Sequence, residues 1–276
     1  MLLQRNLLPL LIILLLCTTN CGQNKIINNY DFSNGERIKL SKELNEISGI
    51  TFSDVGDLFC HTDEVGIIYQ LEINTGKIIK KFYIGESLLK ADFEDITFAN
   101  GFFYLVSSSG AILKFKEGKD NEKVQYERFV TPLSSKNDIE GIAYVHQSNS
   151  LLLACKESPG KKLKGVKAVY RFSLDDNKLI NDPFILIKEN ELNGFFSSSF
   201  KSSAIISMNN GNLLILGGKS IGLVEISQKG QVINKIILNN YHLQPEGIAI
   251  SKKGILIISD EAAGKNPYLT IYKKTK

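Results

Sequence analysis

The sequence predicts an all-β protein, a five-bladed β-propeller whose ring is closed by pairing of the N- and C-terminal strands. Two observations lead to this fold class. A short motif recurs five times along the 276 residues at a spacing close to 46, and Gly, Asn and Asp separate the apolar runs that follow it. After the N-terminal segment no apolar stripe has helical spacing, so we interpret the runs as strands. Four short strands in a unit of this length are typical of a propeller blade.

The recurring motif places one residue at the same point of each unit. Its five copies occupy residues 46–52, 92–98, 138–144, 201–207 and 244–250. The residues at the third position, which we call the anchors, are Ser48, Glu94, Glu140, Ser203 and Glu246. Successive anchors are 46, 46, 63 and 43 residues apart, so the third unit alone is long. We expect its extra length in residues 159–165 and 190–200.

The two ends of the chain are expected to complete the fifth blade together. Only 30 residues follow the last anchor, which is too few for a whole unit. Residues 31–46 contain the sequence Arg-Ile-Lys-Leu at 37–40, and this stretch can supply the missing outer strand. Closing the ring in this way removes the exposed sheet edge on which other chains pair. We therefore expect residues 31–276 to form a single domain, and the protein to be a monomer.

The first 21 residues have the features of a lipoprotein-type signal peptide. An aliphatic run at residues 7–17 follows Arg5, as in a secretory signal, and it is too short to span a membrane. The cysteine after the run resembles a bacterial lipoprotein box, with Cys21 as the favoured lipidation site and Cys17 as the alternative. Residues 22–30 then form a tether. We expect export across the inner membrane and lipid anchoring at the bacterial cell envelope, with secretion without lipid as the alternative.

The composition excludes some classes of function. The 33 basic and 29 acidic residues give a net charge of +4, which is too balanced for a protein that binds nucleic acid through a basic face. The chain contains no Trp, so its repeats are not of the kind defined by a Trp-Asp dipeptide.

Acidic residues recur at equivalent positions and are expected to meet near the axis of the ring. One set consists of the anchors Glu94, Glu140 and Glu246, and a second set, after the second strand of each unit, consists of Glu64, Glu157 and Glu261. Carboxylates brought together without a counterion repel one another. Calcium would relieve this repulsion, because it accepts about six to eight oxygen ligands in flexible geometry. The alternative is that the glutamates brace neighbouring blades through hydrogen bonds.

The ordered motifs resemble those of the SdiA-regulated, YjiK-like family over about residues 40–273. The resemblance rests on the openings Glu-Ile-Ser-Gly-Ile-Thr-Phe at 46–52 and Asp-Phe-Glu-Asp-Ile at 92–96, on Gln-Pro-Glu-Gly-Ile-Ala at 244–249 and on Ser-Asp-Glu at 259–261. It implies a five-bladed propeller with a bound calcium ion and no firmly attached catalytic activity. The sequence departs from the family pattern at Ser108 and Ser109, which replace an acidic residue, and at Ser203, which replaces the anchor Glu.

Two functions fit these features. The first is an envelope-anchored, calcium-binding propeller that acts as a binding or scaffolding module for a protein or glycan at the cell envelope, with its lipid anchor in the membrane. The second is a calcium-dependent hydrolase of lactone, ester or phosphate substrates that uses a metal in the central channel. No catalytic constellation is evident in the sequence, which favours the non-enzymatic function.

Overall fold

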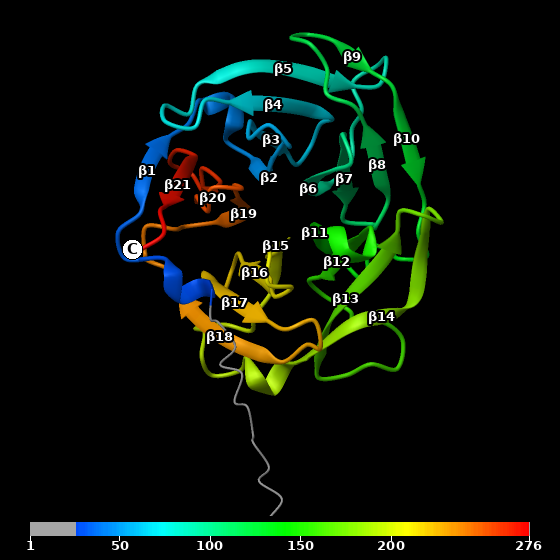
Figure 1. Ribbon diagram of the computed structural model, residues 1–276, viewed down its shortest axis with the longest axis vertical. Helices are drawn as coiled ribbons and strands as arrows, with labels where there is room; N and C mark the ends of the chain where they lie inside the picture. Colours follow the sequence, from blue (N-terminus) through cyan, green and yellow to red (C-terminus); the bar gives the residue numbers. More distant parts are fainter. Residues whose placement is uncertain (1–25, 276) are drawn as a thin grey trace, which may run out of the picture.

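The computed structural model describes residues 26–275 as five sheets of mainly antiparallel strands arranged around one axis (Figure 1). We number the sheets blades 1 to 5 by the order of their innermost strands along the chain. These inner strands are β2 (Ile47–Phe52), β6 (Phe93–Ala99), β11 (Ile139–Val145), β15 (Ser202–Ser207) and β19 (Pro245–Ile250). The five-bladed propeller predicted from the repeat spacing is therefore confirmed.

The other strands of each blade lie progressively farther from the axis. Blade 1 adds β3 (Leu58–Thr62), β4 (Ile67–Leu71) and β5 (Ile78–Ile84); blade 2 adds β7 (Phe102–Ser107), β8 (Ile112–Phe115) and β10 (Tyr126–Phe129); blade 3 adds β12 (Ser150–Cys155), β13 (Val166–Ser173) and β14 (Lys178–Lys188); blade 4 adds β16 (Leu213–Gly217), β17 (Gly222–Ile226) and β18 (Val232–Ile237); blade 5 adds β20 (Leu256–Asp260) and β21 (Tyr268–Tyr272). The helical elements of residues 26–275 are the short 3-10 turns η1 (Ile26–Asn29), η2 (Lys42–Leu44), η3 (His146–Ser148) and η4 (Glu189–Glu191).

Both ends of the chain contribute to blade 5. Strand β1 (Glu36–Lys39) is its outermost strand and pairs antiparallel with β21, with Glu36 opposite Ile271 and Lys39 opposite Tyr268. Figure 1 shows the two strands side by side. The predicted closure of the ring is confirmed, and it covers the edge that β21 would otherwise expose.

One strand was not anticipated from the sequence. The two-residue strand β9 (Lys123–Val124) lies in the connection between β8 and β10 of blade 2, but it pairs parallel with β5 of blade 1. The connection thus links the outer edges of two blades. Its run is too short and too polar to show the periodicity of a strand.

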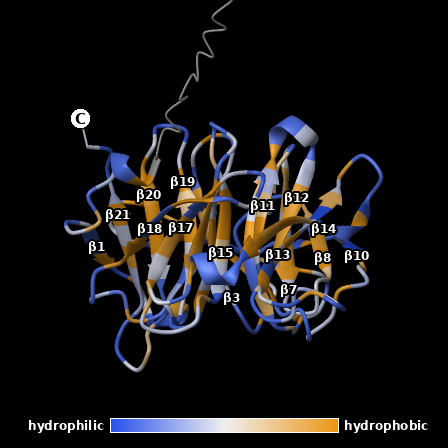
Figure 2. Cartoon of the chain, turned by 90° about the horizontal axis from the view of Figure 1, so that it is seen from below, coloured by the Kyte–Doolittle hydropathy of each residue, from blue (hydrophilic) through white to orange (hydrophobic). Residues whose placement is uncertain are grey.

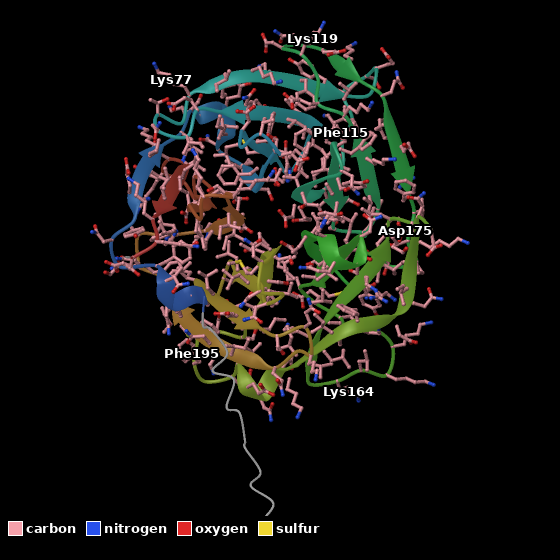
Figure 3. The ribbon with its side chains drawn as sticks, in the orientation of Figure 1. Lys77, Phe115, Lys119, Lys164, Asp175 and Phe195 are labelled. Carbon is pink, nitrogen blue, oxygen red and sulfur yellow. The ribbon has the colours of Figure 1, made fainter. Side chains whose placement is uncertain are left out.

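Apolar side chains fill the interfaces between blades. The turns at the two faces of the ring are hydrophilic, and the strands between them are mostly hydrophobic (Figure 2). At the interface of blades 1 and 2, the rings of Phe59 and Phe103 pack edge to face with their centroids 4.9 Å apart. Phe115 joins this cluster from β8, whereas Lys119 and Lys164 stand on the outer rim (Figure 3).

Each inner strand has a register shift at its anchor, because an extra residue there opposes the second strand. Such β-bulges re-aim side chains at the end of a strand. The residue after the anchor is Gly in blades 1, 3 and 5, and the inner strands approach closely at this level. A Cβ atom on Gly247 would lie 2.5 Å from the carbonyl oxygen of Ser48 in blade 1. The repeated Gly therefore allows neighbouring blades to meet beside the anchors.

The described chain begins with residues that pack on the propeller. The backbone amide of Ile27 donates to Glu225 Oε2 in blade 4 at 3.1 Å, and the Tyr30 hydroxyl donates to the carbonyl of Gly254 in blade 5 at 3.0 Å. This part of the expected tether at 22–30 is thus held against the domain. The expected signal peptide, with Cys17 and Cys21, lies outside the described residues. Within residues 26–275, no helix has the length and apolar character that a membrane span requires.

Candidate functional site

The five anchors lie together at one end of the channel because each is the second residue of its inner strand. The two serine anchors brace blades: the Ser48 hydroxyl donates to the carbonyl of Glu94, and the Ser203 hydroxyl donates to the carbonyl of Pro245 at 2.9 Å. Each serine anchor thus holds its blade to the next one through a hydrogen bond to the backbone. The three glutamate anchors behave differently.

Glu94 and Glu140 form a carboxyl cluster with Asp138 between blades 2 and 3, which we call the blade 2–3 cluster. One carboxylate oxygen from each of the three residues lies within 4.8 Å of the others. The Lys156 ammonium forms an ion pair with Glu140 and lies 3.9 Å from Asp138 Oδ2. This cluster therefore has a cation of its own, which the protein supplies.

Burial and mutual repulsion govern the protonation of the blade 2–3 cluster. Burial raises the pKa of Glu94, and the negative charge of Glu140 raises it further. Burial also raises the pKa of Glu140, whereas Lys156 and a hydrogen bond with Glu94 oppose the rise. Burial thus favours the neutral form of the Glu94 carboxyl group, whereas the ion pair with Lys156 favours the ionised form of Glu140. One proton and one lysine thus balance much of the negative charge.

Glu246 is half-buried beside this cluster without belonging to it. Burial, followed by the charge of Glu140, raises the pKa of Glu246 to about 7. Gln244 opposes the rise through a hydrogen bond, and Lys156 opposes it through its charge. The three glutamate anchors are therefore electrostatically linked, as expected for side chains that converge on one axis.

A second carboxylate cluster lies between blades 1 and 5 and consists of Glu46, Asp63 and Glu261; we call it the blade 1–5 cluster. One oxygen from each lies within 4.8 Å of the others. Within residues 26–275 none of the three forms an ion pair with a basic side chain. Asp63 Oδ1 is buried without a hydrogen-bond partner, and so is Oδ1 of Asn45, the neighbour of Glu46. This cluster has unused oxygen ligands and no cation from the described chain.

The same two effects act on the blade 1–5 cluster. Burial, and then the charges of Glu246, Glu46 and Asp63, raise the pKa of Glu261 to about 8. Burial is also the main reason that the pKa of Asp63 is raised, with the charge of Glu46 next. A bound dication would reverse both shifts, because it favours the ionised carboxylates.

The remaining two expected metal ligands lie apart from both clusters. Glu157 is exposed and pairs with Lys201, whose hydrogen bond lowers the pKa of the carboxyl group. Glu64 is exposed beside Asp63 but is not a member of the cluster that Asp63 joins. Of the six expected ligands, the structure thus brings Glu94 and Glu140 together, and it places Glu261 with two other residues.

Sequence reasoning did not select Glu46, Asp63, Asp138 or Lys156. A signal for two of them was present: Glu46 and Asp138 each stand two residues before an anchor, at the start of their motif copies. Asp63 follows the second strand of blade 1, next to the residue that was selected. The position of Lys156 between two acidic partners depends on the close approach of blades, which no sequence pattern shows.

Beneath the anchors, the Asp95 carboxylate lies in the channel, with its side chain 2% exposed. Its Oδ1 accepts from the amide of Ile96 at 2.9 Å, and its Oδ2 accepts from the amide of Ile142 in the next blade at 2.8 Å. Burial raises the pKa of Asp95, and the amides of Ile142, Ile96 and Ile205 oppose the rise. Residues further along the inner strands line a cavity of about 180 Å³. Asp95 therefore stands between this cavity and the acidic end of the channel.

The oxygen ligands available at this end fit calcium better than a transition metal. The blade 1–5 cluster offers only carboxylate oxygens, which are among the ligands that calcium prefers. His61, the nearest histidine along the chain, is buried and accepts from the amide of Gly49 through Nε2. The donor set is thus that of a hard cation.

Comparison with known proteins agrees with this fold. The sequence model of the SdiA-regulated family matches residues 27–264. No curated protein matches the chain in sequence. Among solved structures, the fold is similar to that of a luciferin-regenerating enzyme, with a TM-score of 0.57 at 9% identity over 87% of this chain and 95% of that chain.

Two further structures are similar to the same degree. The glutaminyl cyclase of Myxococcus xanthus has a TM-score of 0.58 at 13% identity, over 87% of this chain and 96% of that chain. A streptogramin B lyase has a TM-score of 0.53 at 13% identity, over 88% of this chain and 98% of that chain. At these identities the likeness extends to the fold alone.

Proposed function

The chain belongs to the SdiA-regulated family of β-propellers, and we propose that it is a calcium-binding module held at the cell envelope, where it binds or scaffolds another envelope component. The observation that carries the calcium proposal is the blade 1–5 cluster. Each of its three carboxylates brings one oxygen within 4.8 Å of the others, and Asp63 Oδ1 is buried with no partner in the described chain. Leaving a buried carboxylate oxygen without a partner costs free energy, which a bound cation would recover.

Calcium at this position would join two blades at the point where the ring closes. Glu46 and Asp63 flank strands of blade 1, whereas Glu261 follows β20 of blade 5, the blade built from both chain ends. An ion that binds the folded ring and not the unfolded chain stabilises the fold by mass action. Calcium would therefore stiffen the face that the module presents to its partner.

Isothermal titration of the purified chain with calcium tests this proposal. The expected result is one site, with a dissociation constant of about 10⁻⁴–10⁻³ M, the range of extracellular calcium modules. Asp63→Asn is expected to weaken binding by about 10-fold or more, because it removes charge from a ligand. Glu64→Gln is the matched control, since Glu64 is the exposed neighbour of Asp63 outside the cluster. Equal affinities in the two variants, or no binding by the unmodified chain, would refute the site.

The envelope location rests on the N-terminal sequence and has its own test. Lipid attached at Cys21 would hold the propeller at a membrane, with residues 22–25 between the lipid and the packed η1. Metabolic labelling with a fatty-acid analogue is expected to mark the chain and Cys17→Ala, but not Cys21→Ala. Loss of labelling in Cys17→Ala alone would place the lipid on Cys17 instead of Cys21. Absence of label from the unmodified chain and from both variants would refute the anchor.

The blade 2–3 cluster gives a specific reason to test the hydrolase alternative. A Glu94 carboxylic acid beside a Glu140 carboxylate is an arrangement that can supply a proton and accept one. Turnover of lactone, aryl-ester and phosphomonoester panels in calcium distinguishes the two functions. Activity that is lost in Glu94→Gln and Glu140→Gln would establish the hydrolase, and absence of turnover supports the binding module.

A further inference from the structure

The first described residues lie at one end of the ring, beside the hairpin between β19 and β20. The Tyr30 hydroxyl donates to the carbonyl of Gly254 in that hairpin at 3.0 Å, and the amide of Thr275 donates to the carbonyl of Asn29 at 2.8 Å. The hairpin follows an inner strand, so it lies at the end of the ring opposite the anchors. The C-terminus is at the same end, at the upper edge of Figure 2. We call this end the tether end, and the opposite end, which carries both carboxylate clusters, the acidic end.

The tether is too short to let the acidic end rest on a membrane. Only residues 22–25 separate Cys21 from η1, and an extended chain places Ile26 within about 18 Å of Cys21. The inner strand β19 has six residues, and a strand of that length spans about 20 Å along the axis. A lipid on Cys21 would therefore bring the tether end, or the outer strands beside it, to the bilayer.

An exposed apolar side chain stands at the tether end. Val55 is 84% exposed, more than any other large apolar side chain of the described residues. It lies in the turn between β2 and β3, the blade 1 counterpart of the hairpin that contacts Tyr30. The ammonium group of Lys252 in that hairpin donates to the carbonyl of Asp54 at 2.7 Å, which joins the two turns. Insertion at a bilayer interface would remove the apolar surface of Val55 from water.

Unpaired lysines lie beside this apolar side chain and η1. Lys274 forms a β-bridge with Tyr30, and a Cβ atom on Gly254 would lie 2.6 Å from Lys274 Cε, so the lysine lies against the hairpin. Lys253 is exposed in the hairpin itself. Within residues 26–275 neither lysine has a carboxylate within ion-pair distance. Both ammonium groups are therefore available to an anionic surface.

The carboxylates near these lysines do not cancel their charge. Lys252 lies 3.7 Å from Asp54 Oδ1, and Lys273 lies 3.3 Å from Glu36 Oε2, so each of these carboxylates already has a lysine. The remaining carboxylate of the two turns, Asp57, is half-buried. The two unpaired lysines therefore leave this part of the tether end positive.

We propose that the tether end docks on an anionic phospholipid bilayer, with Val55 at the level of the headgroups and with Lys253 and Lys274 against the lipid phosphates. The inference rests on the proposed lipid anchor and names the surface on which the anchored module lies. Anionic lipid attracts exposed lysines and repels carboxylates, so charge and tether length select the same end. The acidic end, with the proposed calcium site, then faces away from the bilayer and is free to meet another envelope component.

Fluorophores at the two ends of the acylated chain, bound to vesicles, test this orientation. An environment-sensitive fluorophore is attached to Val55→Cys or, as the matched control, to Val130→Cys. Val130 is also exposed, at 73%, and it follows β10 at the acidic end. Cys60 and Cys155 are buried, so the introduced thiol takes the label. On vesicles of phosphatidylglycerol and phosphatidylcholine in equal parts, we expect a blue shift at position 55 and none at position 130.

Vesicles of phosphatidylcholine alone separate docking from anchoring. The acylated chain is expected to co-sediment with them through its lipid, but with a smaller shift at position 55. Equal shifts at the two positions on the anionic vesicles, or no shift at either, would overturn the docking surface while co-sedimentation leaves the anchor intact. A chain that sediments with neither kind of vesicle would refute the anchor and the docking surface together.

Charge reversals test the role of the lysines. Lys253→Glu and Lys274→Glu are each expected to move the equilibrium on anionic vesicles about 5-fold or more toward the undocked chain, the effect of one lysine near such a surface. Lys219→Glu is the control, because Lys219 is an exposed lysine in the turn after β16, at the acidic end. Shifts at position 55 that are the same in all three variants would overturn the role of the lysines and, with it, the proposed surface.

Discussion

Replacement of Asp95 is the most informative perturbation of the channel. Alanine at this position removes the acceptor of the Ile96 and Ile142 amides, which are bonded at 2.9 and 2.8 Å. A buried donor left without a partner costs about 1–3 kcal/mol, so two of them cost about 2–6 kcal/mol. Two effects reduce this sum: relief from burying the carboxylate, whose raised pKa reports the cost, and water that can enter from the adjoining cavity. We expect a net loss of about 3 kcal/mol.

Asparagine separates the charge from the acceptor. Asp95→Asn removes the buried charge but keeps one carbonyl oxygen for the amides, so its loss is expected to be about half that of Asp95→Ala. In a domain of this size, a loss of about 3 kcal/mol lowers Tm by about 6–12 °C. Scanning calorimetry and urea unfolding measure both variants. Asp182→Ala, an exposed carboxylate of β14 without a hydrogen bond in the described structure, is the control.

The order of stability of the three chains tests whether Asp95 acts as a hydrogen-bond acceptor. We expect the unmodified chain to be most stable, followed by Asp95→Asn and then by Asp95→Ala. Asp95→Ala within about 0.5 kcal/mol of the unmodified chain, the scale of a surface substitution, would refute the role of the carboxylate as an acceptor. A larger loss in Asp95→Asn than in Asp95→Ala would show that charge, not hydrogen bonding, is what the channel requires.

Three further predictions concern the blades and their charges. Burial raises the pKa of Glu261 from 4.5 to about 8, so the folded chain without calcium keeps a proton that the unfolded chain releases. The stability that Glu261 contributes is therefore complete below about pH 4.5 and is lost as pH rises through about 8. Glu261→Gln is expected to flatten this part of a profile of Tm against pH. Gly247→Ala places a Cβ 2.5 Å from the Ser48 carbonyl oxygen and is expected to lower the free energy of unfolding, measured in urea, by about 1–3 kcal/mol. A variant as stable as the unmodified chain would contradict this. Ser203→Ala removes the bond to the Pro245 carbonyl and is expected to cost about 1 kcal/mol by the same measurement, with no change if that bond is dispensable.

The propeller architecture could be predicted from the sequence because each copy of the repeated motif coincides with the inner strand of one blade. The motif that gave the spacing coincides with the inner strands, and its third position coincides with the bulge. The Gly after the anchor recurs because the blades meet there, as at Gly247. The run at 37–40 was sufficient to predict β1, because the last blade lacked one strand.

The site could be predicted only in part, because the anchors alone do not determine which side chains meet. Equivalent positions converge, which correctly placed Glu94 beside Glu140. Neighbouring blades also bring non-equivalent positions together, as with Asp63 and Glu261. The position of Lys156 beside Glu140 and the extra strand β9 both depend on contacts between units. Periodicity within a unit carries no information about such contacts.

The central claim is that calcium binds at the blade 1–5 cluster. A crystal structure of the chain grown with calcium, with anomalous data, tests it most directly. We expect an anomalous peak coordinated by Glu46, Asp63 and Glu261, with Lys156 still paired to Glu140. A peak among Glu94, Asp138 and Glu140, or none at either cluster at saturating calcium, would contradict it.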